Sequence, residues 1–188
     1  SVDNTIEEAI NAGATVALRH CDNCGQGTAI STGIKYFLQQ TKANYLITFD
    51  ADEQHLVEDA YSMVLFAKRK KANAVFGNRF IEKQNSDEVP KVRKLVLLIA
   101  VIFESIFFKI PLSDAHNGLR VLSRKSCNFL AELDSSEMAH ATEIGFRLVK
   151  YGIKIYEYPC KILYCKNGKK SGSPLFFMNI ISELLQKK

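Results

Sequence analysis

Two aspartates stand where a run of apolar residues ends. Residues 45–49 read Tyr-Leu-Ile-Thr-Phe, and Asp50-Ala51-Asp52 follow directly. A short apolar run bounded by polar residues predicts a buried strand, and open α/β sheets bind ligands at the carboxyl ends of their strands. Side chains two apart on an extended backbone point the same way, so both carboxylates can face one divalent cation whose shell a bound diphosphate completes. The pair therefore predicts chemistry on a nucleoside diphosphate.

Alternating strand and helix patterns surround this pair. In the first half of the chain we expect a helix from Ile6 to Gly13, a strand over 15–19, a helix over about 29–41, a strand over 45–49, a helix over 57–71 and a strand over 74–76. Strands that alternate with helices through short connections form right-handed βαβ units. The pattern thus predicts an α/β fold with a mostly parallel, Rossmann-like sheet flanked by helices.

The second half contains a long apolar segment. From Lys91 to Ile110 a basic start leads into apolar residues that Glu104 interrupts, which predicts either a buried helix or a helix lying in a membrane interface. A strand over 119–122 and a helix over 138–151 follow. Residues 153–164 are extended in character, and Pro159 places them at a sheet edge or a bulge. Residues 174–188 predict an amphipathic helix.

Length and charge restrict the class of protein. The 188 residues, 47% of them hydrophobic, fit one domain, with 1–80 as a nucleotide and metal half and 81–188 as an acceptor half. A net charge of +5 gathers at 68–71, 91–94, 166–170 and the last two residues, which suits phosphates or an anionic membrane surface. Nucleic acid is not expected as a partner, because no DNA-binding or RNA-binding motif is present.

The cysteines favour reduced thiols. The chain has five, an odd number, and no amino-terminal signal peptide, which indicates a cytoplasmic setting. Cys21 and Cys24 form a CxxC, but a structural zinc needs four ligands and no second CxxC follows. We therefore expect free thiols rather than a metal centre here.

Further motifs extend along the chain in a recognisable order. They are Asp3-Asn-Thr5, Asn23-x-Gly25-x-Gly27-x-Ala29, Phe49-Asp-Ala-Asp-x-Gln-His55, Gly77-Asn-Arg-Phe80, Asp114-x-x-Asn-Gly-Leu-Arg120, Glu143, Tyr156-Glu-Tyr-Pro159 and Lys166-x-Gly-Lys-Lys-Ser171. With this order and spacing the chain resembles the family 2 glycosyltransferases, in particular the dolichyl- and polyprenyl-phosphate sugar synthases. The resemblance implies a GT-A fold that uses Mg²⁺ or Mn²⁺. It also implies that the first strand-helix-strand of the family, which grips the nucleotide base, is missing before Ser1.

The resemblance assigns the metal site. Asp50 and Asp52 match the DxD pair that holds the cation and the donor diphosphate, and Gln54 matches a further metal contact. The alternatives are a solvated turn and a phosphatase nucleophile of the HAD type. The phosphatase motif expects Gly-Thr where this chain has Glu53-Gln54, which counts against it.

The resemblance also assigns residues to the donor. Asn23, Gly25 and Gly27 match a glycine turn whose backbone amides can approach the nucleotide, although a tight turn without a ligand explains them as well. Arg79 matches a phosphate-binding arginine, with a surface arginine as the alternative. Arg120 is expected to bind a donor or acceptor phosphate, with a structural ion pair as its alternative. Lys166 and Lys169 match a basic loop over the donor phosphates.

Two carboxylates match positions near the acceptor. Asp114 is expected to serve there as a catalytic residue, and its alternative is a helix or turn cap. Glu143 faces the acceptor side in the family, but it stands four residues before Arg147 and forms a salt bridge equally well.

The expected reaction is transfer of a hexose, with inversion, from a UDP- or GDP-linked donor. The acceptor is a polyprenyl phosphate or a growing glycan, and the apolar 91–110 helix favours the lipid at the inner face of the membrane. A glycan hydroxyl would need Asp114 or Glu143 as a base, whereas a phosphate oxygen is already ionised. A chain without its base pocket could instead be a non-catalytic binding partner that assembles, also with itself, through an uncovered sheet edge.

Overall fold

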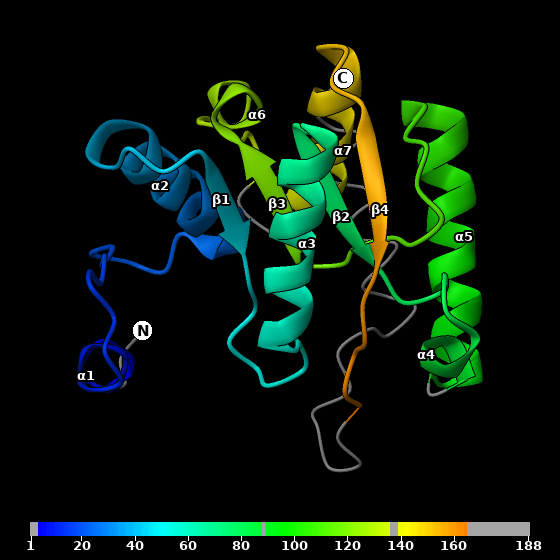
Figure 1. Cartoon of the computed structure of the whole chain (residues 1–188), viewed down its shortest axis with the longest axis horizontal. Coiled ribbons are helices and arrows are strands. Elements are labelled where there is room, and N and C mark those ends of the chain that lie inside the picture. Colours follow the sequence, from blue (N-terminus) through cyan, green and yellow to red (C-terminus); the bar gives the residue numbers. More distant parts are fainter. Residues whose placement is uncertain (1–3, 88, 136–138, 165–188) are drawn as a thin grey trace.

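The computed structural model describes residues 4–87, 89–135 and 139–164, and it shows an α/β architecture (Figure 1). The elements in chain order are α1 (Thr5–Asn11), α2 (Gly25–Gln40), β1 (Tyr45–Thr48), α3 (Val57–Lys70), β2 (Ala74–Asn78), α4 (Lys83–Asp87), α5 (Lys91–Phe108), β3 (Arg120–Ser123), α6 (Arg124–Asn128), α7 (His140–Lys150) and β4 (Ile155–Pro159). The helix expected over 174–188 lies outside the described residues.

The four strands form one mixed sheet in the order β1-β3-β2-β4. Strand β3 runs antiparallel to both of its neighbours, and β2 pairs with β4 in parallel. The prediction of a mostly parallel sheet is therefore wrong. The reason is that β3 inserts between β1 and β2, so the two strands of that βαβ unit run in the same direction without being neighbours.

Helices cover both faces of this sheet (Figure 1). Successive residues of β2 alternate between the faces, as the two-residue period of a strand requires. Ala74 and Phe76 pack with residues of α2, α6 and α7, whereas Val75 packs with Ala60, Met63 and Ala67 of α3. The apolar sides of these helices thus give the molecule a three-layer core.

One expected strand does not form. Residues 15–19 contain no strand, and Val16 and Leu18 are 43% and 50% exposed. Strand geometry needs a hydrogen-bonded neighbour, and none lies beside this segment in the described part of the chain.

The expectation for Pro159 is confirmed, since it is the last residue of β4 and β4 lies at a sheet edge.

Helix α5 lies beyond the β4 edge of the sheet (Figure 1). Its inner side buries Leu97, Ala100 and Glu104, while much of its apolar surface stays exposed. The helix therefore combines a buried side with an open side. None of the helices in the described ranges is both long and apolar enough to cross a membrane.

Candidate functional site

Asp50 and Asp52 lie at one cavity of about 580 Å³. They follow β1, in the turn that connects it to α3. Gln54 and Arg79 line the same cavity, so the fold brings four of the predicted site residues together. The full lining is Gln26, Phe49, Asp50, Ala51, Asp52, Gln54, His55, Arg79, Arg93, His116, Gly118 and Ile162.

Asp50 lies among groups that favour its ionised form. The Nε2 atom of His55 is 3.6 Å from Asp50 Oδ2, and Gln26 Nε2 donates a 3.4 Å hydrogen bond to Oδ1. His55 lowers the pKa of Asp50 most; burial opposes this, and the charges of Arg120 and His140 lower it further. Asp50 is therefore a carboxylate at neutral pH, which is the form that a cation needs.

Gly118 makes room for this carboxylate. A Cβ atom at Gly118 would overlap Asp50 Oδ2 and would stand 2.6 Å from Asp50 Cγ. The residue precedes β3, which pairs with β1 beside it, and its carbonyl accepts a 2.6 Å hydrogen bond from Thr48 Oγ1. The glycine of the Asn117-Gly118 motif is thus required by the close approach of Asp50.

The residues around the turn fit a hard divalent cation. Asp52 is exposed and its Oδ1 accepts a 3.1 Å hydrogen bond from the backbone N–H of Gln54, while Glu53 between them has a φ of 63°. Within the described ranges, no group of three or more His, Cys, Asp or Glu side chains could hold a metal alone. Mg²⁺ commonly takes one or two carboxylates and completes its shell with substrate phosphates and waters. Two carboxylates and an amide beside an open cavity meet that requirement.

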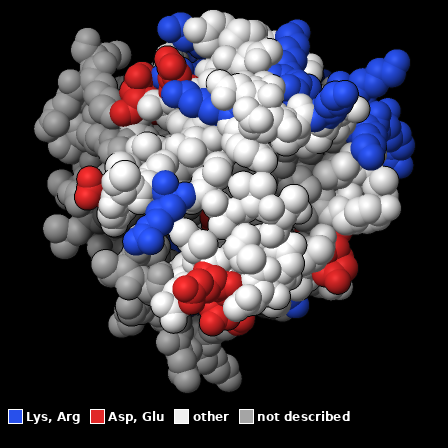
Figure 2. Space-filling model, turned by 90° about the vertical axis from the view of Figure 1, so that its left-hand side faces the viewer, with Lys and Arg blue, Asp and Glu red and all other residues white. Residues whose placement is uncertain are grey.

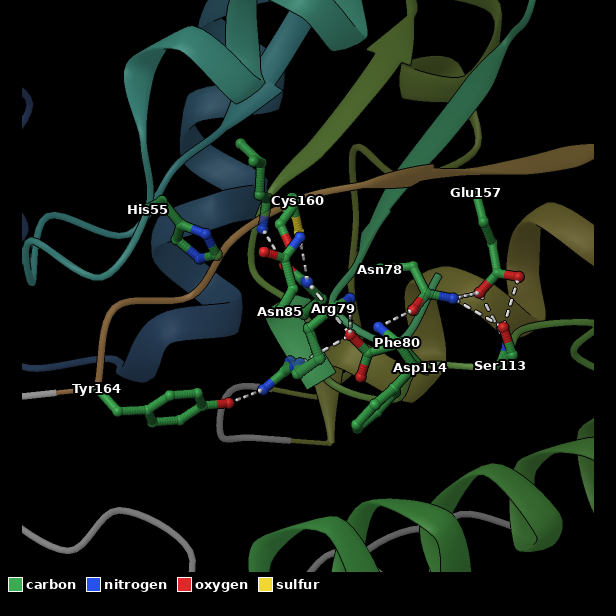
Figure 3. Close-up of polar contacts among 12 residues, drawn as sticks. His55, Asn78, Arg79, Phe80, Asn85, Ser113, Asp114, Glu157, Cys160 and Tyr164 are labelled. Carbon is green, nitrogen blue, oxygen red and sulfur yellow. Dashed lines mark hydrogen bonds and ion pairs between the residues drawn. The ribbon is translucent and has the colours of Figure 1, made fainter. Parts of the chain in front are cut away.

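Arg79 is buried and held in place by Asp114 (Figure 3). Asp114 Oδ2 accepts hydrogen bonds from the backbone N–H and Nε of Arg79, at 3.0 and 2.7 Å. Burial is the largest single influence and works to lower the pKa of Arg79, but the charges and hydrogen bonds of Asp114 and Tyr164 together raise it. Arg79 is only 3% exposed, which excludes the surface-arginine alternative.

Tyr164 joins this arginine to a second one. Its hydroxyl lies 3.2 Å from Arg79 Nη1, and its ring lies 5.3 Å from the guanidinium carbon of Arg93 in α5. Arg93 lines the same cavity as the aspartates. The sequence indicated Arg93 only as part of a basic cluster, because its approach to the site depends on how α5 packs.

Arg120 is a buried cation beside Asp50. It is 3% exposed and lies 5.3 Å over the ring of Phe76, and its Nε has no hydrogen-bond partner. Burial lowers its pKa to about 10, although Asp50 and Glu104 oppose this. No carboxylate in the described ranges lies within ion-pairing distance of it, so the structural ion-pair alternative does not apply. With Asp50, Gly118 and His140 it lines a smaller cavity of about 280 Å³.

Glu143 is engaged by its neighbours. Its carboxylate accepts hydrogen bonds from the backbone N–H groups of Asp134 and Ser135, both at 2.8 Å, and from Arg147 Nε at 2.7 Å. This geometry matches the salt-bridge alternative, and a catalytic role for Glu143 stays a prediction.

The glycine turn is a helix start. Helix α2 begins at Gly25, which has a φ of 81°, and the backbone N–H of Gly25 donates a 3.2 Å hydrogen bond to Asn23 Oδ1. Gly27 lies inside the helix, where a Cβ atom would overlap the carbonyl oxygen of Ser135. Asn23 and Gly25 line a separate cavity of about 760 Å³ beside α1. The structure thus explains Gly27 by helix packing, while Gln26 next to it reaches Asp50.

Charged side chains are dispersed on the face that α1 and α2 help to form. Figure 2 shows carboxylates there in separate groups, one of which lies next to basic side chains. The excess of basic residues does not make one continuous patch on this face. Lys166 and Lys169 lie outside the described residues.

Solved structures share this fold. The chain aligns over 99% of its length with glucosyl-3-phosphoglycerate synthase from Mycobacterium tuberculosis in complex with UDP, at a TM-score of 0.61 and 17% identity, and covers 65% of that chain. A complex of the same enzyme with Mn²⁺, UDP-glucose and phosphoglyceric acid aligns at a TM-score of 0.60 and 14% identity, with the same coverage.

Curated relatives are more similar in sequence. An uncharacterized protein of Methanocaldococcus jannaschii is 28% identical over all of this chain and 77% of its own length. The UDP-N-acetylglucosamine–dolichyl-phosphate N-acetylglucosaminyltransferase of Methanococcus voltae is 25% identical over 84% of this chain and 63% of its own length. The chain therefore spans about two thirds to three quarters of these relatives.

A family model describes the segment that holds the aspartate pair, Arg79 and Arg120. Residues 1–130 match the model for glycosyl transferase family 2. That match covers more than half of the 188 residues and includes the whole lining of the cavity apart from Ile162. On this match, the chain belongs to glycosyl transferase family 2.

Proposed function

We propose that this chain transfers a hexose, with inversion, from a UDP- or GDP-linked donor to a polyprenyl phosphate, using Mg²⁺ or Mn²⁺. The observation that carries the proposal is the single cavity that unites Asp50, Asp52, Arg79 and Arg93. Anionic ligands for a cation and cationic ligands for phosphates meet there. A nucleoside diphosphate needs both.

Each residue contributes a separate interaction. Asp50, Asp52 and Gln54 would hold the cation, which when bound neutralises charge on the departing nucleoside diphosphate. Arg79 and Arg93 offer guanidinium donors to phosphate oxygens. Because Tyr164 contacts both arginines, it fixes their separation before any ligand arrives.

The engagement of the two predicted bases supports a phosphate acceptor. Asp114 is ion-paired with Arg79, and Glu143 with Arg147. Each of these carboxylates already accepts a hydrogen bond from its arginine within the protein. A polyprenyl phosphate needs no base because its oxygen is already ionised, whereas a glycan hydroxyl does. The similar Methanococcus voltae transferase is named for a dolichyl-phosphate acceptor.

A non-catalytic role is the second candidate. Strand β1 lies at the edge of the described sheet, with β3 as its one neighbour there. An unpaired edge can accept a strand from another chain, including a second copy of this one. Under this alternative the domain would bind nucleoside diphosphates weakly and assemble with a partner without turnover.

Calorimetric titration of UDP and GDP, with and without Mn²⁺, tests the proposal. The wild-type chain is compared with Asp52→Asn and with the matched control Asp87→Asn, which removes the same charge from an exposed position in α4. We expect binding that depends on Mn²⁺ in the wild type and the control, and a loss of about 100-fold in Asp52→Asn.

The titration also separates the two candidates. The nucleotide that binds more tightly identifies the base of the donor, and transfer of its sugar to a polyprenyl phosphate then confirms the enzyme. Mn²⁺-dependent binding without transfer to either acceptor class favours the non-catalytic role. Equal binding by Asp52→Asn and wild type would refute the metal site.

A further inference from the structure

Helix α5 exposes an apolar seam. Seven of its side chains are between 48% and 71% exposed, and they are Val92, Leu95, Leu98, Ile99, Ile102, Ile106 and Phe107. Positions 92, 95, 99, 102 and 106 alternate steps of three and four, which aligns them along one side of a helix. No other helix in the described ranges exposes as many large apolar side chains, and the largest apolar patch of a protein often marks a binding surface.

The opposite side of α5 forms part of the catalytic region. Glu104 accepts hydrogen bonds from Thr142 Oγ1 at 2.5 Å, and its Oε1 lies 3.1 Å from His116 Nε2. His116 and Arg93 both line the cavity that holds the aspartates. Helix α5 therefore carries the exposed apolar seam on one side, and its other side lies against the cavity of the aspartates.

The dimensions of the seam argue against a second copy as its occupant. Eighteen residues extend about 27 Å, and a strip about 10 Å wide offers about 270 Å². A stable protein interface buries about 800 Å² on each partner. Pairing of α5 with α5 of another copy would cover only about a third of that area.

The charges at the ends of the seam fit an anionic membrane. Lys91 and Lys94 are exposed at its beginning, and Lys109 is exposed at its end. Apolar and aromatic side chains between basic residues are the pattern of a helix that lies in the headgroup region of a bilayer. We propose that α5 binds the surface of an anionic phospholipid membrane through the seam.

This orientation would set the reaction at the membrane surface. With the seam in the bilayer, the end of α5 that holds Arg93 lies at headgroup level, where the phosphate of a lipid acceptor is found. The inference rests on the proposed function for the identity of that acceptor. The membrane contact itself can be measured without any transfer.

Vesicle flotation tests the contact. The full chain is mixed with vesicles of phosphatidylcholine alone or of equal parts phosphatidylcholine and phosphatidylglycerol. The seam variant Leu95→Glu with Ile102→Glu is compared with the control Val57→Glu with Leu65→Glu, which places two carboxylates on exposed apolar positions of α3. We expect wild type and control to float with the anionic vesicles, and the seam variant to bind about 100-fold more weakly or not at all.

Three results would overturn the inference. The first is a wild type that does not float, the second is a seam variant that floats as well as the wild type, and the third is a control whose flotation is weakened as much as that of the seam variant. Sedimentation without vesicles compares the oligomeric state of the wild type and the seam variant. A wild-type oligomer that becomes a monomer in the seam variant would identify a second copy as the occupant of the seam. Titration of UDP and GDP in the presence of Mn²⁺ on the same proteins distinguishes the membrane contact from the proposed function. A seam variant that binds nucleotide normally but no longer floats supports the membrane contact alone. A wild-type chain that floats but binds no nucleotide contradicts only the proposed function.

Discussion

Replacing Gly118 with alanine tests whether the approach of Asp50 is essential. The new Cβ would overlap Asp50 Oδ2 and stand 2.6 Å from Asp50 Cγ, whereas ordinary contact begins near 3.4 Å, so the carboxylate must retreat by at least about 0.8 Å. Bonds between Mg²⁺ and oxygen tolerate deviations of about 0.2 Å. Gly118 has no positive φ, so its backbone conformation accepts alanine and the added methyl group is the only change.

We expect this displacement to weaken Mn²⁺-dependent binding of UDP or GDP by about 100-fold, or about 2.7 kcal/mol. Calorimetric titration measures it, and urea unfolding of the same samples shows whether the fold persists. The control is Gly33→Ala in α2, where a Cβ would meet no atom within 4 Å. This control should leave binding unchanged and stabilise the protein by about 0.5–1 kcal/mol. A folded Gly118→Ala chain that binds nucleotide as tightly as wild type would refute the reasoning.

Other consequences follow from buried polar groups. Arg120→Met should raise the melting temperature, because it removes an unpaired buried cation, yet abolish sugar transfer; a lower melting temperature with normal transfer would contradict its role. Arg124→Ala should destabilise the chain by about 2–3 kcal/mol in urea unfolding, since the Arg124 guanidinium donates hydrogen bonds to four carbonyls within and just after α2. Burial raises the pKa of the thiols of Cys127 and Cys160 to about 12, so iodoacetamide at pH 8 should label the exposed CxxC at 21–24 and spare both, as mass spectrometry would reveal.

Local patterns were sufficient for most elements and for the centre of the site. The apolar run at 45–49 ends in the aspartates, and the position of a strand end requires no distant contact to be inferred. Arg79 was assigned to the donor through the family resemblance, and it lies at the same site because β2 runs in the direction of β1 and ends at that edge of the sheet. Helix starts were less well predicted. Helix α2 begins at Gly25, inside what the glycines indicated as a turn, and Gly27 is explained by its close approach to Ser135.

Long-range packing decided the remaining features. The insertion of β3 between β1 and β2 depends on pairing partners 72 to 78 residues apart in β1 and 44 to 48 residues apart in β2, and it brings Gly118 against Asp50. The pairing of Arg79 with Asp114 and the position of Arg93 likewise join segments whose separation in the sequence gives no local signal. The sequence by itself determined the position of the aspartate pair, because the end of an apolar strand is a local signal, and the family resemblance added Gln54 and Arg79. The tertiary structure alone decided which of them are held by a neighbour and which remain open to a ligand, because that depends on contacts between distant parts of the chain.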